Sequence, residues 1–149
     1  MLFRSKGKDF STVIGPWLIT LDELTPKQIG AKPHHTGANW NLKMTCKVNG
    51  QQVSEGNLGD MDWTFAEIIE RASYGVDLYP GDVIGSGTVG TGCFLELNGT
   101  GKLNDPSYVE QWLQPGDLVE MEIEELGILQ NTIVKEEEDW SILKQKKKA

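Results

Sequence analysis

The chain has 149 residues, of which 14 are Lys or Arg and 22 are Asp or Glu, and its formal net charge is -8 at pH 7. An acidic surface repels phosphate backbones, so this balance disfavours a nucleic-acid-binding protein. The 38% hydrophobic content and the five tryptophans argue against disorder and predict one domain over residues 1–149 with a buried core.

Two features bear on where the protein works. Residues 1–5 lack the apolar run of a secretion signal, and no stretch approaches the roughly 20 apolar residues of a membrane span. Cys46 and Cys93 are far apart and match no metal-binding spacing, so free thiols in a reducing compartment are favoured, with a disulfide left open. We therefore expect a soluble, cytoplasmic protein that has no membrane partner.

The first third of the chain predicts little regular structure. Residues 17–20 are typical of a strand, and residues 21–24 predict a single helical turn with Thr20 as its N-cap. Residues 25–38 contain proline and glycine and are expected to be irregular.

The next segment gives the clearest local signals. Apolar and polar residues alternate over 42–56 around Asn49-Gly50, the strongest short signal for a hairpin. Residues 62–72 have helical spacing with one apolar face, and Asp62 or Thr64 is in position to cap the helix.

A repeated turn organises the second half. Pro-Gly-Asp occurs at 80–82 and again at 115–117, where Pro and Gly favour a tight turn, and strand-like runs follow over 83–88 and 118–123. Further elements are expected as strands over 94–97 and 127–134, a short helical turn over 107–113, and a charged tail over 136–149. The resulting fold class is mainly β, with one main helix.

The glycine-rich run 85–92 is the best candidate for a small-molecule site. Its glycines expose backbone N–H groups that can face an anion. It is neither a P-loop, since no Gly-Lys-Ser/Thr follows, nor a dinucleotide fingerprint, since no βαβ unit surrounds it. The hypothesis that the protein is a nucleotide-binding module depends on this run alone and is the weakest of the alternatives.

Other polar groups have a plain structural interpretation beside the functional one. Lys8 and Thr12 could hold a carboxylate or complete a metal shell, or belong to a surface loop. His34 and His35 are adjacent, point in different directions and have no third ligand at a suitable offset, so a metal site there is disfavoured. Three alternating glutamates over 120–124 are favoured as a solvated strand face.

Glu96 lies between Leu95 and Leu97 in a predicted strand that leaves the glycine-rich run. If the side chain points inward, burial raises its pKa and it could act as a general base. A glutamate on the wet face of a half-buried strand is the other interpretation.

Three blocks, in this order, resemble the fumarylacetoacetate hydrolase family. Residues 8–24 (KDFSTVIGPWLITLDEL) resemble the middle of the family domain. Residues 78–88 resemble its L-x-PGD-x-I-x-x-GT signature, and residues 113–131 its closing L-x-PGD-x-V-E…G-x-L-x-N pattern. The resemblance runs from about residue 6 to 135.

The resemblance implies a mainly β (α+β) fold built around a β-roll, usually in a homodimer. It implies a divalent cation, Mg2+ or alternatively Mn2+ or Ca2+, that polarises a 2-oxo acid. Members of the family hydrolyse carbon–carbon bonds of β-diketo acids such as acylpyruvates, or act on related 2-oxo acids of aromatic catabolism.

The resemblance also assigns roles to individual residues. Lys8 matches the active-site lysine, and Glu96 matches a glutamate that orients the catalytic base, so both are expected to be catalytic. Gly87 and Thr88 match the Gly-Thr pair that contacts substrate, and Thr12 matches a hydroxyl beside the metal.

The main metal ligands of the family, a Glu-x-Glu pair and a later Asp, are expected before the lysine. Glu120-Met121-Glu122 has the right letters but lies in the closing strand motif, and neither His34 nor His35 matches the catalytic histidine. The chain is therefore expected to be a partial domain that does not hold the cation alone and needs an N-terminal partner half. The alternative is a catalytically inactive fragment or assembly subunit.

Overall fold

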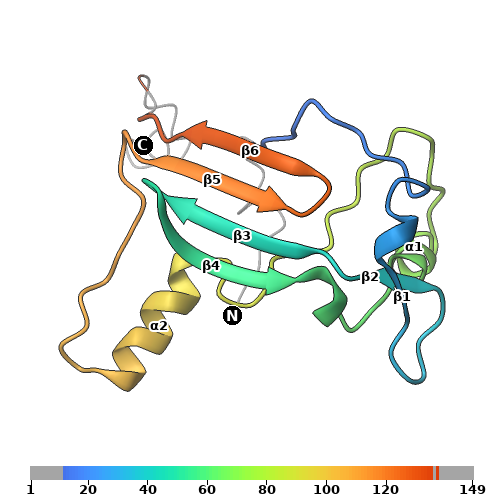
Figure 1. The fold of residues 1–149 in the computed structure, drawn as a ribbon, viewed down its shortest axis with the longest axis horizontal. Helices are drawn as coiled ribbons and strands as arrows, with labels where there is room; N and C mark the ends of the chain where they lie inside the picture. The colour runs from blue at the N-terminus through green and yellow to red at the C-terminus, as the bar shows by residue number, and fades with distance from the viewer. Residues whose placement is uncertain (1–11, 136, 138–149) are drawn as a thin grey trace, which may run out of the picture.

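A computed structural model gives the structure of residues 12–135 and of residue 137. Its main feature is an antiparallel sheet with strand order β4-β3-β5-β6, seen face on in Figure 1. The four strands are β3 (Lys43–Val48), β4 (Gln51–Asn57), β5 (Leu118–Ile123) and β6 (Gly127–Thr132). Two short strands, β1 (Gln28–Gly30) and β2 (Ala38–Trp40), form a separate ladder.

The predicted hairpin is confirmed as the pair β3–β4. Asn49 and Gly50 have φ angles of 51° and 80°, the left-handed pair that a two-residue hairpin turn requires. The predicted strands at 118–123 and 127–134 are also confirmed, and β5 inserts beside β3 so that Lys47 faces Glu120.

The two Pro-Gly-Asp turns close in the same way. The Asp82 carboxylate accepts a hydrogen bond from the Tyr79 N–H at 2.9 Å, and the Asp117 carboxylate accepts one from the Gln114 N–H at 2.7 Å. A strand follows only the second turn. The strand predicted over 83–88 is wrong, because Gly87 has a φ of 92° and the segment crosses the sheet instead of joining its ladder.

The sheet has one polar and one apolar face, as the alternation of β3 and β5 predicts. On the polar face, Lys47 pairs with Glu120 at 3.0 Å and Lys43 with Glu55 at 3.1 Å. Lys27 pairs with Glu124, so two of the three alternating glutamates hold lysines at this surface. The opposite face, called the inner face below, carries Met44, Cys46, Ser54, Gly56, Val119, Met121, Ile123 and Leu129.

Residues 12–135 contain two α-helices where the sequence predicts one main helix. The predicted helix at 62–72 is α1 (Phe65–Ala72), which begins after its N-cap Thr64. The strand predicted over 94–97 is wrong, because these residues open α2 (Phe94–Asn104). Its Leu-Glu-Leu alternation is too short to distinguish the two states, and the polar and glycine residues that follow give no apolar stripe.

Three other expectations fail locally. Residues 17–20 form no strand, and 25–38 are not irregular throughout, because they contain the short 3-10 helix η2 (Thr25–Lys27), β1 and the start of β2. Residues 107–113 form no helical turn. The buried Asn98 of α2 holds this segment instead, donating to the Gln111 carbonyl at 2.8 Å and accepting from its N–H at 2.9 Å.

The core is small and lies where β2, the start of β3 and α1 meet. Leu24, Trp40 and Leu42 are buried, and partly buried apolar side chains pack around them. Many large apolar side chains stay exposed, including Trp17 at 78% and Leu18 at 92%. Of the helices in the described part of the chain, none is long and apolar enough to cross a membrane.

Candidate functional site

The glycine-rich run lies on the inner face of the sheet, at β4, and Figure 1 shows the connection from α1 to α2 passing behind the strands. A β-carbon on Gly56 would lie 3.1 Å from the Cβ of Val89, so a glycine lets the run approach the strand. The hydroxyls of Ser54 and Thr91 are 3.0 Å apart. Residues 86–91, which we call the glycine loop, are therefore fixed against β4.

Glu96 holds the same end of the glycine loop, at Thr91. Its carboxylate accepts a hydrogen bond from the Thr91 N–H at 3.0 Å, and the side chain is exposed in the first turn of α2. The inward strand position that the general-base interpretation required is therefore wrong. The catalytic role implied for Glu96 stays a prediction, and its observed role is to hold the loop.

The free part of the glycine loop faces a hollow. Ser86, Gly87 and Thr88 line a space of about 400 Å³ next to η3 (Leu58–Asp60). Gly87 and Thr88 are both exposed, and no residue of the described chain accepts a backbone hydrogen bond from either of their N–H groups. The loop thus presents hydroxyl and N–H donors to a space that fits a small organic acid.

The segment before the first described strand lies on the same inner face, at the opposite edge. A β-carbon on Gly15 would lie 3.8 Å from Leu129 of β6, whereas the glycine loop contacts β4. Three strand spacings separate these edges, about 14 Å. Thr12 is exposed at the start of this segment, and Lys8 lies outside the described residues, so the roles predicted for both stay predictions.

The described residues do not fit a resident divalent cation. In residues 12–135, no group of three or more His, Cys, Asp or Glu side chains is placed to hold a metal ion. A hard cation takes about six oxygen ligands, and Ser86, Thr88 and Thr91 offer only neutral hydroxyls. Asp60 also lines the hollow, but the carboxylate of Glu55 pairs with Lys43 on the polar face, so the set falls short.

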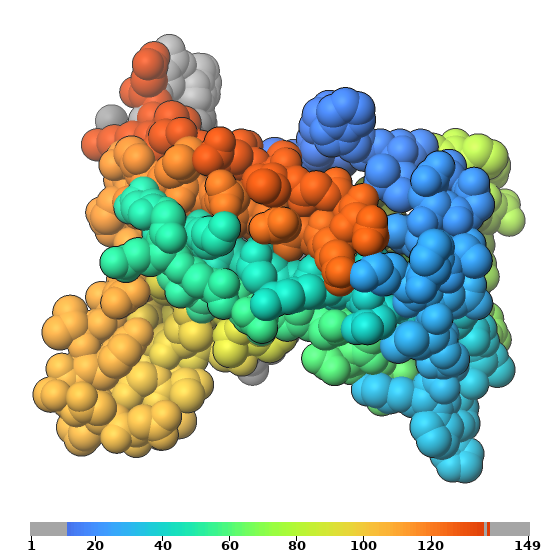
Figure 2. Space-filling model, viewed as in Figure 1, coloured from blue at the N-terminus to red at the C-terminus, as the bar shows by residue number. Residues whose placement is uncertain are grey.

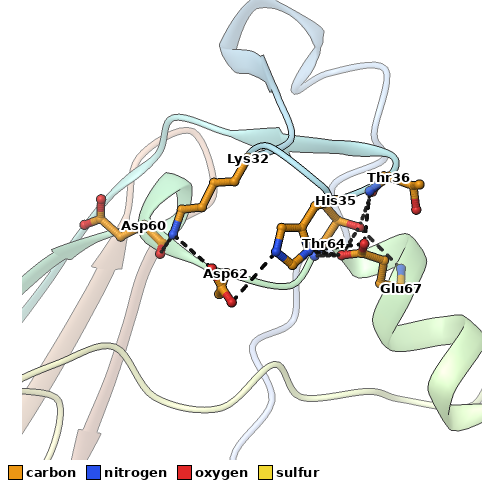
Figure 3. A network of polar contacts seen from close by, with 7 residues as sticks. All are labelled: Lys32, His35, Thr36, Asp60, Asp62, Thr64 and Glu67. Atoms are coloured by element: carbon orange, nitrogen blue, oxygen red, sulfur yellow. Dashed lines mark hydrogen bonds and ion pairs between the residues drawn. The ribbon is translucent and has the colours of Figure 1, made fainter.

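A second polar cluster joins the loop before β2 to α1 (Figure 3). The Glu67 carboxylate accepts hydrogen bonds from the N–H groups of Thr64 at 2.9 Å and Thr36 at 3.0 Å, and contacts His35 Nδ1 at 3.0 Å. The Thr64 hydroxyl in turn accepts from the Glu67 N–H at 3.3 Å and donates to the Thr36 carbonyl at 2.6 Å. We call these four residues the helix clasp.

The helix clasp is structural. Hydrogen bonds from the Thr64 and Thr36 backbone, followed by His35, hold the pKa of Glu67 at about 2, well below its ordinary value. The second nitrogen of His35 lies 3.8 Å from Asp62, and the ring packs edge-on against Trp63. His35 therefore serves the fold. The sequence signal for the clasp is the capping box Thr64-x-x-Glu67.

Comparisons with known proteins give matches that cover most of the chain. The family model described as fumarylacetoacetate (FAA) hydrolase C-terminal matches residues 1–134. A human mitochondrial protein named oxaloacetate tautomerase FAHD2A is 38% identical over 130 residues, covering 86% of this chain and 34% of that protein. An uncharacterized protein of Staphylococcus epidermidis is 33% identical over 134 residues, covering 89% of this chain and 36% of that protein.

The fold has a solved counterpart. A crystal structure from Mycobacterium smegmatis, provisionally described as an HpcE protein, is 28% identical with a TM-score of 0.58, covering 81% of this chain and 36% of that chain. The chain thus spans about a third of the length of the relatives it matches. The family-model match includes the sheet and the glycine loop, and the solved structure confirms the mainly β, α+β fold class. The chain belongs to the fumarylacetoacetate hydrolase family.

Proposed function

We propose that this chain supplies the substrate-binding part of an enzyme that acts on a 2-oxo acid, and that a second polypeptide supplies the carboxylates for the divalent cation. The observation that carries the proposal is the glycine loop, which is fixed to β4 through Val89 and Thr91 while its donors at Gly87 and Thr88 face the hollow. The names of the relatives, which include oxaloacetate tautomerase, support a 2-oxo acid as the substrate class.

In this site the residues of the chain bind and orient the substrate. The Thr88 hydroxyl and the loop N–H groups donate to the carboxylate or to the 2-oxo oxygen, on which negative charge develops when a base removes a proton from C3. A divalent cation would supply Lewis-acid stabilisation of the same charge. In keto–enol interconversion the enolate forms as C3 loses its proton. In hydrolysis of an acylpyruvate it forms as the C3–C4 bond breaks after water has added to the remote carbonyl. One binding site for the enolate therefore serves either reaction.

A second polypeptide is supported by two observations. The described residues lack a carboxylate set for the cation, and the segment next to the inner face exposes most of the surface of Trp17 and Leu18. Exposed apolar side chains of this size mark an interaction surface. A partner that covers this segment is in position to bring its carboxylates to the inner face.

The experiment is calorimetry with oxalate, which mimics the enolised acid. Mg2+ with oxalate is titrated into this chain, into a polypeptide carrying the Glu-x-Glu and Asp segment of the family, and into their mixture. We expect tight binding only in the mixture, and its loss in Thr88→Val with the fold unchanged. Turnover of acetopyruvate by the pure chain, abolished by a chelator, would contradict the need for a partner.

A non-catalytic assembly subunit is the second candidate, favoured by the same lack of metal ligands. It predicts that the mixture forms a stable complex but binds no oxalate. Size-exclusion chromatography of the mixture, run beside the calorimetry, separates the two functions.

A further inference from the structure

Asparagine is followed by glycine at two places in the chain, Asn49-Gly50 and Asn98-Gly99. Glycine has no side chain to hinder its backbone nitrogen, so this nitrogen can attack the asparagine Cγ and close a five-membered succinimide ring. The Cγ–Nδ2 bond breaks, and ammonia leaves with the proton that the glycine nitrogen gives up. Water then opens the ring at either of its carbonyls, which yields an aspartyl or an isoaspartyl residue.

The structure protects one of these two pairs. Asn98 is 2% exposed, and its side-chain amide binds the Gln111 backbone through hydrogen bonds of 2.8 Å and 2.9 Å. Gly99 lies inside α2, where the helix uses the backbone N–H groups. Attack at Asn98 therefore requires the helix to open and its contact with Gln111 to break first.

The other pair is accessible. Asn49 and Gly50 are both exposed at the tip of the β3–β4 hairpin, and the Gly50 N–H finds no hydrogen-bond acceptor among the described residues. Only the asparagine side chain is held, because its Oδ1 accepts from the Leu118 N–H at 2.9 Å and its Nδ2 donates to Asp117 at 2.8 Å. Breaking these two surface hydrogen bonds frees Cγ for attack while both strands stay paired.

The same hydrogen bonds indicate what the reaction does to the fold. We call Asn49, Asp117 and Leu118 the turn joint, because they connect the hairpin tip to the start of β5. Hydrogen bonds from the Gln114 N–H and then from Asn49 hold the pKa of Asp117 below its ordinary value, so this carboxylate is charged at neutral pH. An aspartyl product places a second carboxylate where Nδ2 now donates.

We propose that Asn49 is a site of spontaneous deamidation and that its conversion releases the turn joint. The isoaspartyl product also adds a main-chain carbon to a two-residue turn whose length sets the register of Val48 opposite Gln51. Because ammonia is lost, the converted form accumulates as the molecule ages. No residue of the turn joint lines the hollow, so the conversion is independent of the proposed function.

The first test follows the reaction in the full chain. The protein is kept in warm, mildly alkaline buffer beside a sample in concentrated guanidinium chloride, and its proteolytic peptides are analysed by chromatography and mass spectrometry. These methods separate the asparaginyl, aspartyl and isoaspartyl forms at both sites. In the folded chain we expect Asn49 to convert faster than Asn98 by about tenfold or more. In guanidinium chloride we expect both to convert at similar rates.

The second test measures the effect on stability. Asn49→Asp reproduces the aspartyl product and should shift the urea unfolding equilibrium about tenfold toward the unfolded chain, through a lost hydrogen bond and new repulsion. Adding Asp117→Asn should restore most of this loss, because an amide again donates to a carboxylate and its oxygen still accepts from Gln114. Asn41→Asp, at an exposed position that keeps its acceptor for Asn57, adds the same charge and should leave the equilibrium unchanged.

Each test has a result that overturns the proposal. If Asn49 stays intact in the folded chain while it converts in guanidinium chloride, or if Asn98 converts equally fast in the folded chain, the hairpin tip is not the selected site. If Asn49→Asp is as stable as the parent chain, or if adding Asp117→Asn restores nothing, conversion does not release the turn joint.

Discussion

Replacing Thr64 by valine tests whether the helix clasp is held by hydrogen bonds or by packing. Thr64 is 1% exposed, so the isosteric Val keeps its contacts but removes the hydroxyl that serves both Glu67 and Thr36. Loss of an N-cap costs about 1 kcal/mol. Loss of the hydrogen bond to the Thr36 carbonyl costs about 1 kcal/mol more. The free energy of unfolding should fall by about 2 kcal/mol in total, a factor of about 30 in the unfolding equilibrium.

Thr64→Ser is the matched variant, because it keeps the hydroxyl and removes one buried methyl, a loss of about 0.8 kcal/mol. Urea unfolding followed by far-ultraviolet circular dichroism measures both, provided that the slope of the transition stays constant. A valine variant as stable as the parent chain would refute the hydrogen-bond account. A serine variant less stable than the valine variant would show that packing dominates at this position.

Three further predictions concern other parts of the structure. The pKa of Glu67 is about 2 in the folded chain and ordinarily 4.5, so the stability that its carboxylate contributes is present above pH 4.5 and is lost as pH falls toward 2. The midpoint of urea unfolding, measured against pH, should show this loss. Glu67→Gln should flatten the dependence of the midpoint on pH. Gly56→Ala places a methyl against Val89, so the amide resonances of residues 86–91 should move, whereas Gly30→Ala, which meets no atom within 4 Å, should leave them in place. Asn98→Ala removes both hydrogen bonds to the Gln111 backbone, so hydrogen exchange at the Gln111 amide should speed up at least tenfold. An unchanged exchange rate would show that Asn98 does not hold this segment.

The helices and strands that depend on interactions between residues close in the chain can be predicted from this sequence. The β3–β4 hairpin follows from Asn49-Gly50, whose backbone takes the left-handed conformation that the turn needs. Helix α1 follows from its apolar face and its cap. Helix α2 does not, because its polar and glycine residues carry no apolar periodicity. Gly101 is there because the Tyr108 ring would lie 2.6 Å from a β-carbon, a contact that no local pattern reveals.

The candidate site is predictable in its residues but not in its arrangement. The glycine loop and Thr88 are visible in the sequence, yet the loop is located by Gly56 and Ser54, more than 30 residues earlier. The sequence predicts Glu96 on a strand, with its side chain either inward or on the wet face, and instead it holds the loop from a helix.

The two Pro-Gly-Asp turns have a consequence for the order in which the chain folds. Each turn is closed by a carboxylate that reaches a backbone N–H only three positions away, at Tyr79 and at Gln114. Closing so short a span loses little chain entropy, so neither turn has to wait for a distant strand. The turn before β5 can therefore form early. It reduces the number of conformations that β5 samples before it pairs with β3, which lies some 70 positions away in the chain.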